Sequence, residues 1–181
     1  MAWTTPLTAV SNAALTAAQW NASVRDNLAM TAPALASTSG SIFAVNGTNS
    51  IAQRIPSNTA QLGGETTSST TYTSTLSGGA GSAGPSLTVT TGPKALVSFS
   101  CRQSTSINGT NVWTSVAVSG ATSISASDNW ATSYDLNGQL FHGLAYVEGN
   151  LTPGSNTFTM SYRVSGGTGT FATRRLSVVP F

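Results

Sequence analysis

The sequence predicts a mainly β protein, an antiparallel jelly-roll sandwich preceded by a short N-terminal helix and a β-hairpin. Ser and Thr make up close to a third of the 181 residues. From about residue 70, apolar and hydroxyl residues alternate with period two, and glycine-containing turns separate the alternating runs. Thr favours strands, whereas Ser, Asn and Gly favour turns. About eight short strands follow, the number that a two-sheet jelly roll requires.

One helix is expected, near the N-terminus. Thr16 begins the capping-box pattern Thr-x-x-Gln, so the helix should start there. Trp20, Val24 and Leu28 recur every four residues and share one face of the helix. Pro33 is expected to end the helix after about four turns. An isolated helix of about 15 residues is marginal in water, so this helix needs a partner surface.

Two short apolar runs at 41–45 and 50–55 flank an Asn-Gly turn, which predicts a hairpin. Because a lone hairpin is marginally stable, residues 1–55 are predicted to form an anchoring and trimerisation segment that orders against another surface. Residues 56–69, rich in Thr, Ser and Gly, are predicted to be a polar linker. Residues 70–181 then form the jelly-roll domain.

The predicted anchoring and oligomer-interface residues all lie in this first segment. They are Trp3, Trp20, Val24, Arg25, Leu28, Ile42, Phe43 and Ile51. Full burial of one large apolar side chain contributes about 1.5–3 kcal/mol, so several of them in three copies could hold a trimer on a larger particle.

Charge is scarce, and this excludes several classes of partner. Seven Lys and Arg oppose five Asp and Glu, and charged residues make up 7 % of the chain, against about 25 % in ordinary domains. No basic stripe for nucleic acid can form. No apolar run approaches the roughly 18 residues of a membrane span, and no signal peptide is visible. The exposed strand edges lack charged protection, which predicts a homo-oligomer, preferably a cyclic trimer.

Catalysis is not expected. His142, the single His, lies in an apolar strand without a nucleophile elbow, and a hydrogen-bonded structural role is the simpler interpretation. Asp128 and Asp135 lie on either side of Trp130 and Tyr134, and a glycosidase cleft often pairs carboxylates with aromatics, but no local spacing specifies the pairing and two turn aspartates are the simpler interpretation. One His, one Cys and five scattered acids predict no metal site and no cofactor. Cys101 is expected to be a small buried hydrophobe.

Two further groups of residues have an open interpretation. Aromatic residues that could stack on a host-surface glycan, with core packing as the alternative role, are Trp113, Trp130, Tyr134 and Tyr146. The Arg174-Arg175 pair is expected to be solvated or to lie between subunits rather than to form an anion site, and Arg163 can join it.

Several segments resemble virion proteins of tailed phages of actinobacteria. At the N-terminus these are WTTP at 3–6, LTAAQWN at 15–21, VRDNL at 24–28 and IAQR at 51–54. In the β-domain they are GPKALV at 92–97, LTPGSNTF at 151–158, YRVSGGTGTFA at 162–172 and the two arginines that follow. Members of this group are variously minor tail, capsid fibre or head-decoration proteins. The resemblance implies a tumour-necrosis-factor-like jelly roll, often trimeric, attached through its N-terminal segment, and it implies no catalysis.

We therefore expect a bacteriophage virion structural protein that is assembled in the host cytoplasm. The preferred form is a homotrimeric capsid decoration or head-fibre protein whose residues 1–55 contact the major capsid protein. A minor tail protein that contacts other tail proteins is one alternative. A module that binds a host-surface glycan is the other.

Overall fold

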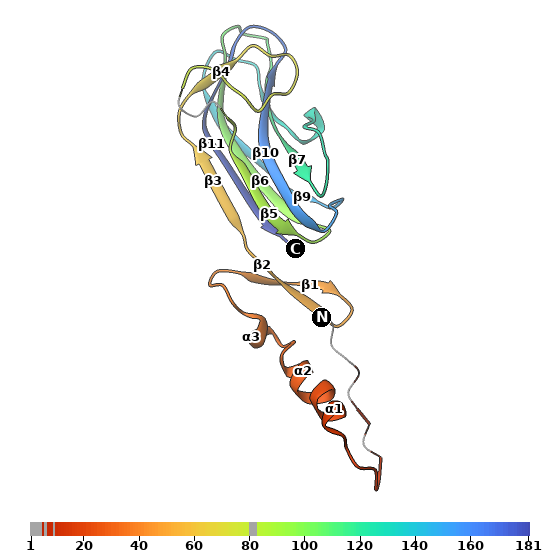
Figure 1. Ribbon diagram of the computed structural model, residues 1–181. Coiled ribbons are helices and arrows are strands. Elements are labelled where there is room, and N and C mark those ends of the chain that lie inside the picture. Colours follow the sequence, from red (N-terminus) through yellow and green to blue (C-terminus); the bar gives the residue numbers. More distant parts are fainter. Residues whose placement is uncertain (1–4, 6, 9, 80–82) are drawn as a thin grey trace. The chain divides into compact units, whose positions relative to one another are not determined.

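The computed structural model describes residues 5, 7–8, 10–79 and 83–181. The chain divides into two units (Figure 1). We call residues 1–55 the N-terminal unit and residues 56–180 the sandwich unit. Phe181 groups with the first of these.

The N-terminal helix runs from Ala17 to Leu28 in three consecutive segments. These are α1 (Ala17–Trp20), a π-helical turn η1 (Asn21–Arg25) and α2 (Asp26–Leu28). Its predicted start is confirmed, because the Thr16 hydroxyl accepts from the backbone N–H of Gln19 at 3.2 Å, and the Gln19 side chain accepts from the backbone N–H of Thr16 at 3.0 Å. Both halves of the capping box are therefore present.

The prediction that Pro33 ends this helix is wrong. The helix ends at Leu28, where the Thr31 hydroxyl donates to the Leu28 carbonyl at 2.8 Å and the Thr31 backbone N–H donates to the same oxygen at 3.1 Å. Pro33 instead lies in the first turn of a separate short helix, α3 (Ala32–Leu35). Proline is tolerated there because an N–H in the first turn has no partner within the helix.

The predicted hairpin is confirmed as β1 (Ile42–Gly47) paired antiparallel with β2 (Ser50–Arg54). The loop lies two residues later than the Asn-Gly pattern suggests. Asn46 and Gly47 end β1, and Thr48 and Asn49 form the turn, with Asn49 at φ +54°. Asn tolerates this left-handed conformation, which is why it can serve as a turn residue here.

The sandwich unit contains two antiparallel sheets, so the predicted fold class is confirmed (Figure 1). One has the order β5–β10–β7–β8, and the other has the order β3–β11–β6–β9 with β4 also paired to β11. The first sheet comprises β5 (Ser86–Thr91), β7 (Val112–Gly120), β8 (Thr132–Tyr134) and β10 (Gly154–Val164). The second comprises β3 (Ser57–Gln61), β4 (Glu65–Thr67), β6 (Ala95–Thr105), β9 (Leu140–Glu148) and β11 (Gly169–Pro180). Successive strands from β5 to β7 and from β9 to β11 alternate between the sheets, as jelly-roll connections do.

Residues 56–69 are not a linker. Within them, β3 pairs with β11 from Gln61 opposite Arg174 to Ser57 opposite Val178, and β4 pairs with β11 around Thr66. The sequence conceals these strands because β3 has no large apolar residue. Its hydrogen bonds to β11, rather than an alternating apolar face, hold it in the sheet.

The hydrophobic core lies between the two sheets. Among the described residues, every buried hydrophobic side chain belongs to the sandwich unit, and the buried side chains of the N-terminal unit are Asn27 and Arg54. The strands β6, β10 and β11 supply most of the large core residues, including Phe99, Phe158, Tyr162, Phe171 and Leu176. Cys101 is fully buried among them, as predicted. Period-two burial along β6 explains why its alternating sequence was readable.

Candidate functional site

The predicted anchoring residues of the helix remain largely in solvent. Trp20 is 55 % exposed and Leu28 is 59 % exposed, whereas Val24 is half-buried. Arg25 forms an exposed ion pair with its neighbour Asp26 at 2.8 Å, and such surface pairs contribute little to stability. Trp3 lies outside the described residues. The helix therefore presents two large apolar side chains to its surroundings.

The hairpin shows the same pattern. Phe43 is 38 % exposed, while Ile42 and Ile51 are half-buried. The structure adds Val45, which is 80 % exposed. The sequence could have indicated Val45, because Val45 lies in the same apolar run as Phe43.

A further apolar surface precedes the helix, and the sequence did not reveal it. A depression of about 350 Å³ is lined by Leu7, Thr8, Val10, Ala13, Ala14, Leu15 and Gln19. Leu7, Val10 and Leu15 are each exposed. They follow no helical or strand periodicity, so no pattern marked them before the structure was known.

The four candidate glycan-stacking aromatics do not form one platform. Trp130, in the short 3-10 helix η2 (Asp128–Trp130), stacks on Tyr146 with ring centroids 5.3 Å apart, and Trp130 remains 53 % exposed. Tyr134 packs against the core, which agrees with the alternative prediction of core packing rather than with glycan stacking. Trp113 carries the guanidinium of Arg163 at 3.7 Å from its ring centre. One aromatic face, that of Trp130, is therefore substantially open.

Asp128 belongs to a closed polar network. Arg163 donates to it through Nε at 2.9 Å and also through its terminal nitrogen, and the Tyr72 hydroxyl donates to it at 2.8 Å. The hydrogen bond from Arg163 lowers the pKa of Asp128, and burial raises the pKa of Tyr72. Asp135 takes no part in this network. Asp128 is thus held as an ionised partner of arginine, which does not suit a general acid.

His142 has the structural environment that its strand position predicted. Its Nε2 is hydrogen bonded to Oε1 of Gln103, and the Gln103 amide donates to the Thr114 hydroxyl. This chain joins β9, β6 and β7, so it links the two sheets through the core. Burial lowers the pKa of His142, which keeps the ring neutral at pH 7. Burial likewise raises the pKa of Cys101 to about 12, so its thiol stays protonated.

The described part of the chain shows no cluster of three or more His, Cys, Asp and Glu side chains that could hold a metal ion. In the same residues, no helix combines the length and apolar character needed to cross a membrane.

The expectation for Arg174 and Arg175 is wrong in part. Arg174 is fully buried, forms an ion pair with Glu65 of β4, and lies with its guanidinium 5.6 Å from the Tyr162 ring centre. Arg163 lies on β10 in the other sheet. Only Arg175 is exposed, because neighbouring strand residues point to opposite faces. Sequence alone could not reveal that Glu65, in an apparent linker, supplies the buried counter-charge.

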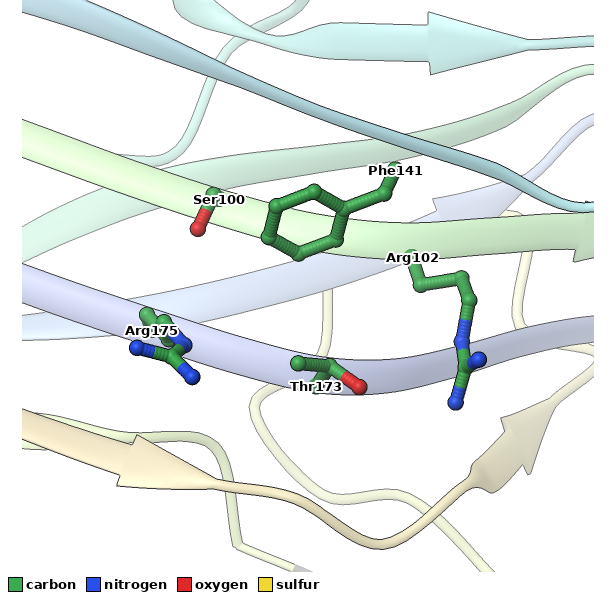
Figure 2. Close-up of a pocket in the computed structure, with 5 residues that line it drawn as sticks. All are labelled: Ser100, Arg102, Phe141, Thr173 and Arg175. Carbon is green, nitrogen blue, oxygen red and sulfur yellow. The ribbon is translucent and has the colours of Figure 1, made fainter.

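Arg175 lines a hollow on the outer face of the β3–β11–β6–β9 sheet (Figure 2). Its volume is about 460 Å³, and its lining residues are Ser100, Arg102, Phe141, Thr173 and Arg175. Thr173 has φ +50°, an unusual backbone conformation for a β-branched residue, and such strain costs on the order of 1–3 kcal/mol. The strained residue and the two arginines thus occur together.

No protein-family model matches this chain, and no curated protein sequence matches it.

Proposed function

We propose that the protein is a structural component of a tailed-phage virion, a homotrimeric capsid decoration or head-fibre protein that residues 1–55 attach to the particle. One structural observation carries the attachment, while the assignment to a virion rests on the resemblance of residues 3–6, 15–21 and 24–28 to virion proteins of tailed phages. The N-terminal unit has a capping box at Thr16 and a paired hairpin but no buried hydrophobic side chain among its described residues, while Trp20, Leu28 and Val45 are exposed. A short helix and a lone hairpin are marginal by themselves, so a partner surface is needed to stabilise them.

Burial of these side chains supplies the attachment energy. Each large apolar side chain contributes about 1.5–3 kcal/mol when it leaves water completely. In a trimer, three attachment segments bind to one particle, and the second and third bind at high effective concentration. The major capsid protein is the expected partner, with a tail protein as the alternative.

The outer faces of the two sheets differ in a way that supports an oligomer. On the β5–β10 pair, hydroxyls of Ser86 and Thr159, and of Thr88 and Thr157, bond to each other at 2.9 and 2.8 Å. On β9 of the other sheet, by contrast, Phe141 is 53 % exposed and Val147 is 56 % exposed. We assign the subunit contact to the outer face of the second sheet, because apolar exposure on a sheet face favours association.

Sedimentation measures this directly. The full chain is expected to sediment as a trimer at micromolar concentration, and Phe141→Ser with Val147→Ser is expected to shift it toward monomer. The matched control is Thr88→Ala on the hydroxyl face. A stable monomer of the unaltered chain at that concentration contradicts the trimer.

Attachment is tested by assembly of particles with variants of the full chain. Deletion of residues 1–35, and separately Trp20→Ser with Leu28→Ser, should release the protein from particles. Ala18→Ser, an exposed change on the same helix, is the control and should leave incorporation intact. Incorporation of the deletion variant at full occupancy contradicts the attachment role. An image of the particle with this protein labelled distinguishes head from tail.

A host-surface glycan module is the second candidate, because Trp130 presents an open ring face backed by Tyr146. Sugar rings stack on such faces. Binding of the full chain to a glycan array, with loss of the signal in Trp130→Ala, supports it. Absence of binding to any glycan removes it without affecting the attachment proposal.

A further inference from the structure

The hollow on the outer face of β6, β9 and β11 has a chemistry that attachment through residues 1–55 does not use (Figure 2). We propose that it is an anion site, in which Arg102 and Arg175 bind one oxyanion, a carboxylate or phosphate group. This inference goes beyond attachment through residues 1–55, and its sister-copy source rests on the proposed subunit contact, which lies on the same face of the sheet.

The strand register places the two arginines close enough to share a ligand. Arg102 on β6 is opposite Ala172 of β11, and Arg175 of β11 is opposite Ser100 of β6. The two arginines are therefore diagonal neighbours on one face, positions that lie about 7–8 Å apart at Cα in regular antiparallel strands. Arginine side chains are long enough to converge on one group from that distance. Figure 2 shows the Thr173 side chain between the two guanidinium groups.

The charge of this hollow has no internal counterpart. Both arginines are exposed, and in the described residues no acidic side chain forms an ion pair with either of them. Glu65 pairs with the buried Arg174, and Asp128 pairs with Arg163. Arg25, Arg163 and Arg174 thus have carboxylate partners, and Arg54 donates to the Asn46 side chain, whereas these two arginines line a hollow together.

The remaining lining residues suit an oxyanion. Ser100 and Thr173 each carry a hydroxyl that can donate to it, and the Phe141 ring lines the hollow as well. Planar guanidinium groups bind carboxylates and phosphates through paired N–H donors, and these charge-assisted bonds are the strong ones.

A β-bulge in β11 positions the residues that line this hollow. The register between β11 and β6 shifts between Ala172 and Arg175, and Thr173 within the shift has φ +50°. Bulges re-aim side chains beside functional sites, and strained residues persist where the surroundings hold them. Here the bulge allows Thr173 and Arg175 to line one hollow while Arg174 remains inside the core.

The anion can come from two sources. It can be a small free anion, or it can be a carboxylate of a sister copy, since the proposed subunit contact lies on this face. Asp135 and Glu148 are the acids without an ion-pair partner among the described residues. In the second case, contact between subunits would bring the arginines of this face close to one another, and the carboxylate offsets their repulsion.

Calorimetric titration of the full chain with inorganic phosphate, and separately with acetate, tests the free-anion source at constant ionic strength. Arg102→Gln with Arg175→Gln should weaken phosphate binding by about tenfold or more, since bonds to charged groups are lost. Lys94→Gln, an exposed cation outside the hollow, is the control and should bind phosphate normally. Unchanged unfolding midpoints confirm that the variants are folded.

Sedimentation of the same variants tests the sister-copy source. If a sister carboxylate occupies the hollow, the Arg102→Gln, Arg175→Gln variant and the Asp135→Asn, Glu148→Gln variant both dissociate, and free phosphate does not bind the intact oligomer. The inference is overturned if neither anion binds the unaltered chain more tightly than the arginine variant and the arginine variant keeps its oligomeric state. Incorporation into particles is measured in parallel, so that failure of the anion site is distinguished from failure of attachment.

Discussion

The two units of this chain make opposite use of their apolar side chains. The sandwich unit buries Phe99, Phe158 and Leu176 to 2 % exposure or less, whereas the N-terminal unit leaves Trp20 and Leu28 more than half exposed. In the described residues of both units, a cap or paired strands supply backbone hydrogen bonds. Hydrogen bonds are formed within both units, whereas buried hydrophobic side chains, among the residues that the structure describes, occur in the sandwich unit alone. We propose that the N-terminal unit packs against a partner surface, because a short helix and a lone hairpin are marginal by themselves.

The largest expected effect on the free energy of unfolding comes from a Phe→Ala substitution in the sandwich core, compared with the same substitution in the N-terminal unit. Phe99→Ala in the sandwich core should lower the free energy of unfolding by about 3–5 kcal/mol, because it leaves a cavity. Phe43→Ala in the hairpin should change it by less than about 0.5 kcal/mol in the isolated protein. Urea unfolding followed by tryptophan fluorescence measures both. Equal losses for the two variants would show that the N-terminal unit has a core of its own.

The two ion pairs provide a second comparison. Arg174→Met leaves the buried Glu65 uncompensated and should cost about 3 kcal/mol or more. Arg25→Met removes an exposed pair in the N-terminal unit and should cost less than about 0.5 kcal/mol. Thermal unfolding distinguishes them. If Arg174→Met is as stable as the unaltered chain, the buried pair does not hold β4 against β11.

Backbone strain gives a smaller effect of opposite sign. Thr173→Gly should raise stability by about 0.5–1 kcal/mol, because glycine adopts φ +50° without the clash that a β-branched residue meets. The hairpin control is Asn49→Gly, at φ +54°, which should change stability less because Asn tolerates this region. Thr173→Gly also removes one hydroxyl from the hollow. A destabilised Thr173→Gly variant would mean that the threonine side chain compensates for its own strain.

The smallest effect is a pH dependence confined to the sandwich unit. The folded protein lowers the pKa of His142 below that of the unfolded chain, so the unfolded chain binds a proton first as the pH falls. Stability should therefore be complete above about pH 6.5 and decline below it. His142→Gln should remove this dependence between pH 7 and pH 5. The unaltered protein becoming more stable over that range would contradict the assigned environment of His142.

The fold class followed from sequence because period-two burial on β6, β10 and β11 is visible in the order of residues. The helix start was also readable, since the capping box is a local interaction. The strands β3 and β4 were not, because their polar residues are held by pairing with β11, more than 100 positions later in the chain. The local composition of a strand does not indicate a partner strand so far along the chain.

The candidate functional residues likewise fall into those that the sequence indicated and those that it did not. Trp20 and Leu28 were selected by helical spacing, and their exposure agrees with a role in contacts, although the contacts themselves stay a prediction. The hollow around Arg102 and Arg175 was not foreseen. It depends on the register of three strands and on a bulge at Thr173, and no spacing in the sequence brings its residues together.

Hydrogen exchange of the full chain, free and assembled on particles, tests the central claim most directly. In the free protein, amides of β1, β2 and the helix should exchange nearly as fast as unstructured backbone, while β6, β10 and β11 stay protected. On particles, the same N-terminal amides should become protected. The account is contradicted if those amides are as protected in the free protein as the core strands, or if assembly leaves their exchange unchanged.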